Sequence, residues 1–105
     1  MTTDRELLEL AAKAAGVKEL FFSDTGEPCY WGYYDSAGKG WNPTTWNPLT
    51  DDGDALRLEV DLNLTQKHRF LEILYEENGR CDGDYRKASR LAIVRAATEI
   101  GRQMK

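Results

Sequence analysis

Residues 84–103, D-Y-R-K-A-S-R-L-A-I-V-R-A-A-T-E-I-G-R-Q, carry the strongest helical pattern of the chain. Asp84 can cap a helix start, because its carboxylate accepts hydrogen bonds from N–H groups of the first turn. Apolar residues then recur at helical spacing at Ala88, Leu91, Ala92, Ala96, Ile100 and Met104, beside Ile93 and Ala97. We therefore predict a helix over 85–103 that is the main core helix and covers a small sheet.

A second helix is predicted near the N-terminus. Thr3 and Glu6 stand three residues apart, as in a capping box, whose two side chains satisfy backbone N–H groups at a helix start. Gly16 supplies the left-handed residue that commonly ends a helix. The sequence thus predicts a helix over 4–15, with its apolar stripe at Leu7, Leu8, Ala11, Ala14 and Ala15.

Two apolar stretches on either side of a turn predict a β-hairpin. The first covers residues 17–23 and the second, rich in aromatic side chains, covers 29–34. Residues 24–28, D-T-G-E-P, have typical turn chemistry. A further strand is predicted over 70–75, F-L-E-I-L-Y, and the pair Asn78-Gly79 would end it with a turn.

The segment between the hairpin and that strand repeats the sequence Trp-Asn-Pro within residues 41–50. Proline lacks the N–H that a central strand must donate, so we predict no long central strand there. Residues 56–64 alternate with period two, as a strand would. However, Thr50 is a good N-cap, and the negative charges of Asp51, Asp52 and Asp54 suit the N-terminal end of a helix. We predict a helix over 51–62.

These elements together predict an α+β fold in the order α-β-β-α-β-α. The chain of 105 residues is long enough for one hydrophobic core, so residues 1–105 are expected to form a single domain. The sheet is expected to be short, mainly antiparallel and covered by helices.

Composition indicates a cytoplasmic protein. The charged N-terminus does not resemble a secretory signal, and no apolar stretch approaches the ~20 residues of a membrane span. Cys29 and Cys81 lie far apart without a neighbouring Cys or His at ligand spacing. We therefore expect two reduced thiols and no membrane association.

Charge is divided unevenly along the chain. Residues 1–79 carry 7 basic and 15 acidic side chains, whereas residues 80–105 carry 7 basic and 3 acidic ones. A basic cluster at Arg86, Lys87 and Arg90 could bind nucleic acid, but no aromatic side chains are interleaved with it and the overall pI is near 5.0. The favoured interpretation is that the two parts pair with each other, within one subunit or across a homodimer.

No arrangement of residues indicates catalysis, a cofactor or a metal centre. Aligning Gly53 with the sixth position of an EF-hand loop puts Pro48 at the first position, where a side-chain oxygen is needed. A magnesium ion on two of the neighbouring carboxylates, or a pairing of His68 with a cysteine in the folded chain, stays open. We predict that the protein is not an enzyme.

The aromatic side chains are the remaining candidates for a binding site. Burial in the core is the favoured interpretation, followed by a protein interface and then by stacking on a small ligand. The candidate protein-binding residues are Trp41, Trp46, Asp51, Asp52 and Asp54. Of the two rings, Trp46 abuts the predicted helix and is expected to pack against the core, which leaves Trp41 open for recognition.

Three blocks of the sequence, residues 4–16, 46–58 and 91–102, resemble a family of small proteins encoded by tailed bacteriophages and prophages. The middle block, W-N-P-L-T-D-D-G-D-A-L-R-L, is the most specific of the three. The resemblance implies a bacterial or phage setting and a helix after Thr50, and it transfers no catalytic residue. We expect an accessory protein that binds a host or phage protein, or alternatively a nucleic-acid-binding or DNA-mimicking anti-defence protein.

Overall fold

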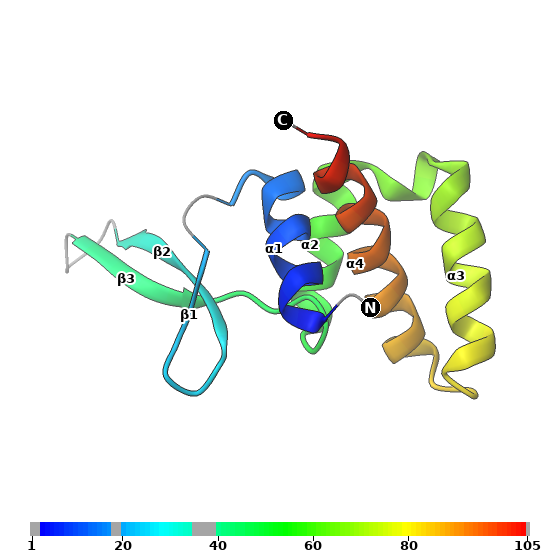
Figure 1. Ribbon diagram of the computed structural model, residues 1–105, viewed down its shortest axis with the longest axis horizontal. Coiled ribbons are helices and arrows are strands. Elements are labelled where there is room, and N and C mark those ends of the chain that lie inside the picture. Colours follow the sequence, from blue (N-terminus) through cyan, green and yellow to red (C-terminus); the bar gives the residue numbers. More distant parts are fainter. Residues whose placement is uncertain (1–2, 18–19, 35–39, 105) are drawn as a thin grey trace.

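The computed structural model describes residues 3–17, 20–34 and 40–104, with the backbone alone for residues 31–34 and 40–43. One helix is followed by a three-stranded antiparallel sheet and then by three helices and a short 3₁₀ turn (Figure 1). The elements are α1 (Asp4–Ala15), β1 (Phe21–Phe22), β2 (Pro28–Tyr34), β3 (Gly40–Thr45), α2 (Asp52–Leu62), η1 (Leu64–Gln66), α3 (His68–Arg80) and α4 (Tyr85–Gln103). The predicted α+β class and the short antiparallel sheet are confirmed.

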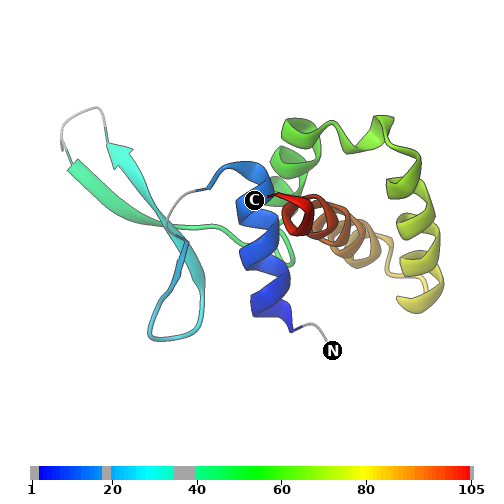
Figure 2. The ribbon, with the colours of Figure 1, turned by 45° about the horizontal axis from the view of Figure 1, so that its top comes forward.

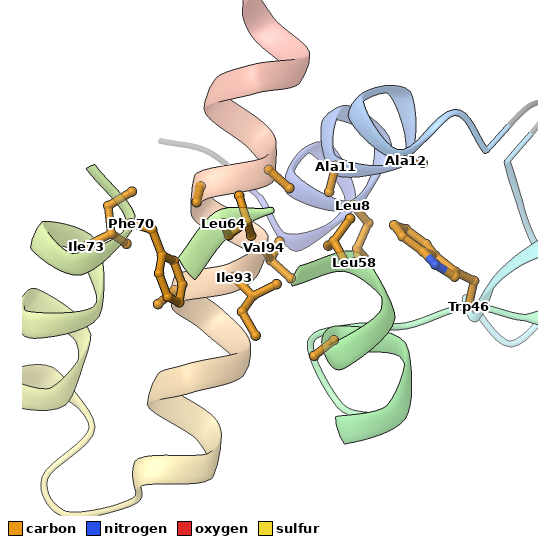
Figure 3. Close-up of a cluster of buried hydrophobic side chains, with 14 residues drawn as sticks. Leu8, Ala11, Ala12, Trp46, Leu58, Leu64, Phe70, Ile73, Ile93 and Val94 are labelled. Carbon is orange, nitrogen blue, oxygen red and sulfur yellow. The ribbon is translucent and has the colours of Figure 1, made fainter. Parts of the chain in front are cut away.

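Helix α4 lies at the centre of the helical body and packs against α1, α2 and α3 (Figures 1 and 3). Small residues make this possible, because Ala88, Ala92 and Ala97 are fully buried and let neighbouring helices approach. The larger core side chains come from all four helices and from η1: Leu8, Leu58, Leu64, Phe70, Ile73, Ile93 and Val94. The prediction that 85–103 is the main core helix is confirmed, with bounds Tyr85–Gln103.

The helix starts follow the predicted capping chemistry. Thr3 Oγ1 accepts a hydrogen bond from Glu6 N at 3.1 Å, and Asp84 accepts one from Lys87 N at 3.1 Å. Helix α2 also forms where a helix was predicted. Its N-cap is Asp51 and not Thr50, and the Asp51 carboxylate accepts a hydrogen bond from Asp54 N at 2.8 Å. Three of the described helices, α1, α2 and α4, therefore begin where a local side chain satisfies a free backbone N–H group, whereas α3 has no side-chain cap.

The predicted hairpin is confirmed as β1 and β2, which pair antiparallel with Phe21 opposite Cys29. The prediction of a strand at 70–75 is wrong, and the third strand is β3, which was not predicted. Because β3 lies at the edge of the sheet, it does not contradict the prediction of no long central strand over residues 41–50. Pro43 lies in β3, which pairs only with β2 in the described sheet. An edge strand tolerates proline because one side of it needs no ladder donor.

Residues 70–75 instead belong to α3, with His68 exposed at its first position. Phe70, Ile73 and Glu77 are buried at spacings of three and four residues, which is the period of a helix face. Asn78 and Gly79 continue this helix, which ends at Arg80. The apolar alternation over six residues was too short to distinguish the two periods.

The sheet lies beside the helical body, at one end of the long axis of the molecule (Figure 2). The expectation that α4 covers the sheet is wrong, because α4 faces the other helices. The near end of the sheet packs against the core through Phe22 and Tyr30. The sheet is connected to the helical body near Trp46. The backbone N–H of Trp46 donates a hydrogen bond to Pro28 O at 2.9 Å, and the Trp46 ring packs against the core (Figure 3). None of the described helices is both long and apolar enough to cross a membrane.

The tightest helix contact is that between α1 and α4. Thr98 Oγ1 donates to Leu7 O at 3.0 Å, and Gly101 faces the backbone of Leu10 so closely that a Cβ at residue 101 would overlap with the Leu10 carbonyl group. Gly79 in α3 has no atoms near the position of a Cβ. Gly79 and Gly101 thus differ in what surrounds them, and of these two only Gly101 is required for packing.

We expect Gly101→Ala to lower the free energy of unfolding by about 2 kcal/mol or more, because α1 must move away from α4. Gly79→Ala is the matched control, and it should stabilise the protein by roughly 0.5–1 kcal/mol through helix propensity. Urea unfolding followed by circular dichroism measures both values. Equal effects of the two substitutions would contradict the close approach of α1 to α4.

Candidate functional site

The two tryptophans of the repeated segment have different places. Trp46 is 7% exposed and belongs to the core, as predicted, so its ring is not available to a partner. Trp41 lies in β3 opposite Tyr33, and its side chain is outside the part of the chain that the structure describes. The segment around Trp46 is thereby a structural connection between the sheet and α2.

Asp54 holds this connection in place. Its carboxylate is largely buried and accepts hydrogen bonds from Asn47 N at 2.9 Å and from Arg57 Nη2 at 2.6 Å. The hydrogen bond and negative charge of Asp54 raise the pKa of the Arg57 guanidinium. Asp51 caps α2 beside it, in line with the predicted acidic helix start, whereas the buried role of Asp54 was not predicted.

Asp52 connects the acidic start of α2 with the basic cluster that contains Arg86 and Arg90. Its carboxylate lies 2.7 Å from Arg90 Nη1 and 3.7 Å from Arg86 Nη1, across the contact between α2 and α4. Arg90 Nε also donates to Leu49 O at 2.9 Å. The acidic helix start and the basic cluster are therefore neighbours in the fold, and the expected pairing between the two parts of the chain occurs here within one subunit.

Further pairs connect α3 and α4 on another side of the molecule. Arg69 contacts Glu99 at 3.0 Å, and Arg95 contacts Glu76 at 3.4 Å and Glu77 at 2.5 Å. Glu77 is fully buried, and its Oε1 has no hydrogen-bond partner within the described residues. These pairs orient α3 on α4, since each crosses that helix contact.

A groove of about 310 Å³ runs along the contact of α2 with the first half of α4. Ala55 and Ile93 form its buried floor. Leu56 and Tyr85 line it while remaining 58% and 67% exposed, and Val60, one turn after Leu56, is 66% exposed. We call the surface made by Leu56, Glu59, Val60, Tyr85, Arg86 and Ser89 the α2–α4 face.

The exposed apolar residues of this face were not found from the sequence. In the helix predicted over 51–62, helical spacing puts Ala55, Leu58 and Leu62 on one side and leaves Leu56 and Val60 on another. Their spacing of four residues was a signal of a second apolar stripe. Exposed apolar side chains that gather beside a groove are typical of a binding surface.

A larger hollow of about 580 Å³ lies between the sheet and the helices. Tyr30 and Trp46 contribute aromatic surface to it, and Asp54, Arg57 and Asp61 contribute charges. Asp54 and Arg57 are already paired with each other, so the hollow offers few free polar groups to a small ligand. The hollow is the space that remains between the sheet and the helical body.

The described residues contain no group of three or more His, Cys, Asp or Glu side chains that could hold a metal ion. His68 is exposed at the start of α3, and Cys29 and Cys81 are free thiols. No protein family, curated protein or solved structure matches the chain.

We expect Asp54→Ala to lower the free energy of unfolding by about 1–3 kcal/mol, because Asn47 N and Arg57 both lose their partner. Asp61→Ala is the matched control on the same helix: Asp61 is exposed, and its substitution should change stability by less than about 0.5 kcal/mol. Thermal and urea unfolding would measure the difference. Similar values for the two variants would show that Asp54 does not hold the connection.

Proposed function

We propose that the protein acts without catalysis, by binding a host or phage protein through the α2–α4 face. The observation that carries this proposal is the exposure of Leu56 and Tyr85, which line one groove, with Val60 exposed one turn after Leu56 on α2. Large apolar side chains in water cost free energy that a partner recovers by covering them, at about 25 cal/mol per Å² of apolar surface. The phage or prophage setting rests on the three sequence blocks named above.

The surroundings of this apolar surface also suit a protein partner. Arg86 and Asp52 stand at the border of the groove, and Glu59 follows on α2. Apolar centres with a charged rim are the usual arrangement of protein interfaces, in which the rim sets orientation and specificity. Tyr and Arg are also the residue types that most often dominate the binding free energy of such interfaces.

Nucleic-acid binding by Arg86, Lys87 and Arg90 is less well supported. Phosphate binding requires basic side chains that are free to exchange counterions for phosphates. Arg90 is instead held by Asp52 and by the carbonyl of Leu49, and Asp52 also lies beside Arg86. A DNA-mimicking role meets the same difficulty, since Asp51, Asp52 and Asp54 all lie within ion-pair distance of arginines of the same chain.

The proposal is tested by capturing partners from lysate of a phage-infected bacterial host with the tagged protein. We expect the proteins that co-purify with the wild type to be lost with Leu56→Glu and with Tyr85→Glu, since each introduces a charge into the apolar surface. Quantitative mass spectrometry measures the enrichment.

Met104→Glu is the control for this experiment. Met104 is 43% exposed and follows the opposite end of α4, roughly 28 Å from Tyr85 along a 19-residue helix. It should retain every partner that the wild type captures. Capture that survives both substitutions in the groove would contradict a role for the α2–α4 face.

A further inference from the structure

Another groove, of about 330 Å³, lies between α1, α3 and α4. Apolar surface in it comes from α1 and α4, and guanidinium groups come from α3 and α4. We call it the Glu77 groove, and it is lined among others by Leu7, Glu77, Arg80, Leu91, Arg95 and Arg102. It shares no lining residue with the groove of the α2–α4 face, so a ligand bound here is independent of the proposed partner.

Glu77 is the unusual member of this groove, because its side chain is fully buried although it ends in a carboxyl group. Its Oε2 accepts hydrogen bonds from Arg95 Nη1 at 2.5 Å and from Arg80 Nη1 at 3.3 Å. Its Oε1 has no hydrogen-bond partner within the described residues. Buried polar atoms of folded proteins are nearly always hydrogen-bonded, and each exception needs an explanation. Oε1 therefore requires an N–H or O–H donor that the described side chains do not supply.

The charges of the groove indicate which group accompanies that donor. Two carboxylates, those of Glu77 and Glu99, line the groove together with three guanidinium groups. Glu99 is also held at 3.0 Å by Arg69, which does not line the groove. A guanidinium has five N–H donors, so Arg80 can bind a second anion in addition to Glu77. A ligand with a negative charge next to its donor group therefore fits the groove best.

Arg80 is the side chain that gives a ligand access to Glu77. Oε1 has less than 1 Å² of accessible surface, so a residue of the groove wall must move before a ligand reaches it. The Arg80 side chain is 67% exposed, whereas that of Arg95 is 24% exposed and lies closer to the Glu77 carboxylate. Arg80 thus makes the weaker of the two contacts and can turn outward into solvent.

We propose that the Glu77 groove binds a free α-amino acid with an apolar side chain. The ammonium group of the ligand donates to Glu77 Oε1, and Arg80 turns to bind the ligand carboxylate together with Arg102. The apolar side chain of the ligand lies against Leu7 and Leu91.

The chemistry and the size of the groove both favour this class of ligand. A free amino acid carries an ammonium and a carboxylate group on one carbon atom, whereas a terminus of a protein chain carries only one of them. The volume of about 330 Å³ is near the lower end of the range for ligand pockets, roughly 300–1,000 Å³. The groove therefore suits a small molecule and not a peptide.

Two-dimensional ¹H–¹⁵N NMR of the full chain tests the site with four probes: L-alanine, L-valine, L-leucine and L-methionine. We expect at least one of them to cause saturable shifts of the Arg80 and Leu91 amides, with a dissociation constant of about 0.1–1 mM. Its analogues without the carboxylate or without the ammonium group should each bind at least about tenfold more weakly. For leucine, these analogues are leucinol and 4-methylpentanoate.

Two variants test the residues that hold the ligand. Glu77→Gln should weaken binding at least about tenfold, because the amide oxygen still accepts from Arg95 while an NH₂ group replaces Oε1. Arg80→Gln should weaken it to a similar degree, since the ligand carboxylate loses a partner. The matched controls are Glu76→Gln and Arg86→Gln, which should bind like the wild type. Glu76 also contacts Arg95, Arg86 is also an exposed arginine paired with a carboxylate, and neither lines the Glu77 groove.

Absence of saturable shifts with all four amino acids up to about 10 mM would overturn the proposal and leave water as the partner of Oε1. Analogues that bind as well as the amino acid would overturn it too, as would binding that neither Glu77→Gln nor Arg80→Gln weakens. If the spectrum of Glu77→Gln shows an unfolded chain, Arg80→Gln decides, because Arg80 is largely exposed.

Discussion

The fold depends on the close approach of α1 to α4. Gly101 leaves no side chain between the two helices at Leu10, and Thr98 donates to the carbonyl of Leu7 one turn earlier. This contact joins the two ends of the chain, so that the segments between them must be arranged around it. Small residues along the rest of α4 then let α2 and α3 pack on its other sides.

The arrangement of the charges follows from this central helix. Because α2 packs on the first half of α4, Asp52 meets Arg86 and Arg90, and two groups that looked like separate binding sites in the sequence largely neutralise each other. The polar residues around Trp46 likewise hold the sheet to the helical body. The large apolar side chains that stay exposed, among them Leu56, Val60 and Tyr85 and also Leu71 and Tyr75 on α3, are not among the residues first considered.

Much of the helical structure could be predicted from local chemistry. The caps at Thr3 and Asp84 and the acidic start of α2 act over three or four residues, so sequence alone reveals them. The strand expected at 70–75 failed because six residues fit both periods, and the long-range burial of Ile73 and Glu77 against α4 decides between them. The exposure of Leu56 was equally hidden, since it depends on which side of α2 meets α4.

The central claim is that the helices around α4 form the stable core, to which the sheet is attached mainly through the segment at Trp46. Native-state hydrogen exchange tests it most directly, because it gives an opening free energy for each amide. The account predicts that amides of α4 between Ala88 and Gly101 exchange only by global unfolding, whereas amides of the β2–β3 ladder exchange by local opening at a lower free energy. Ladder amides as protected as those of α4 would contradict it.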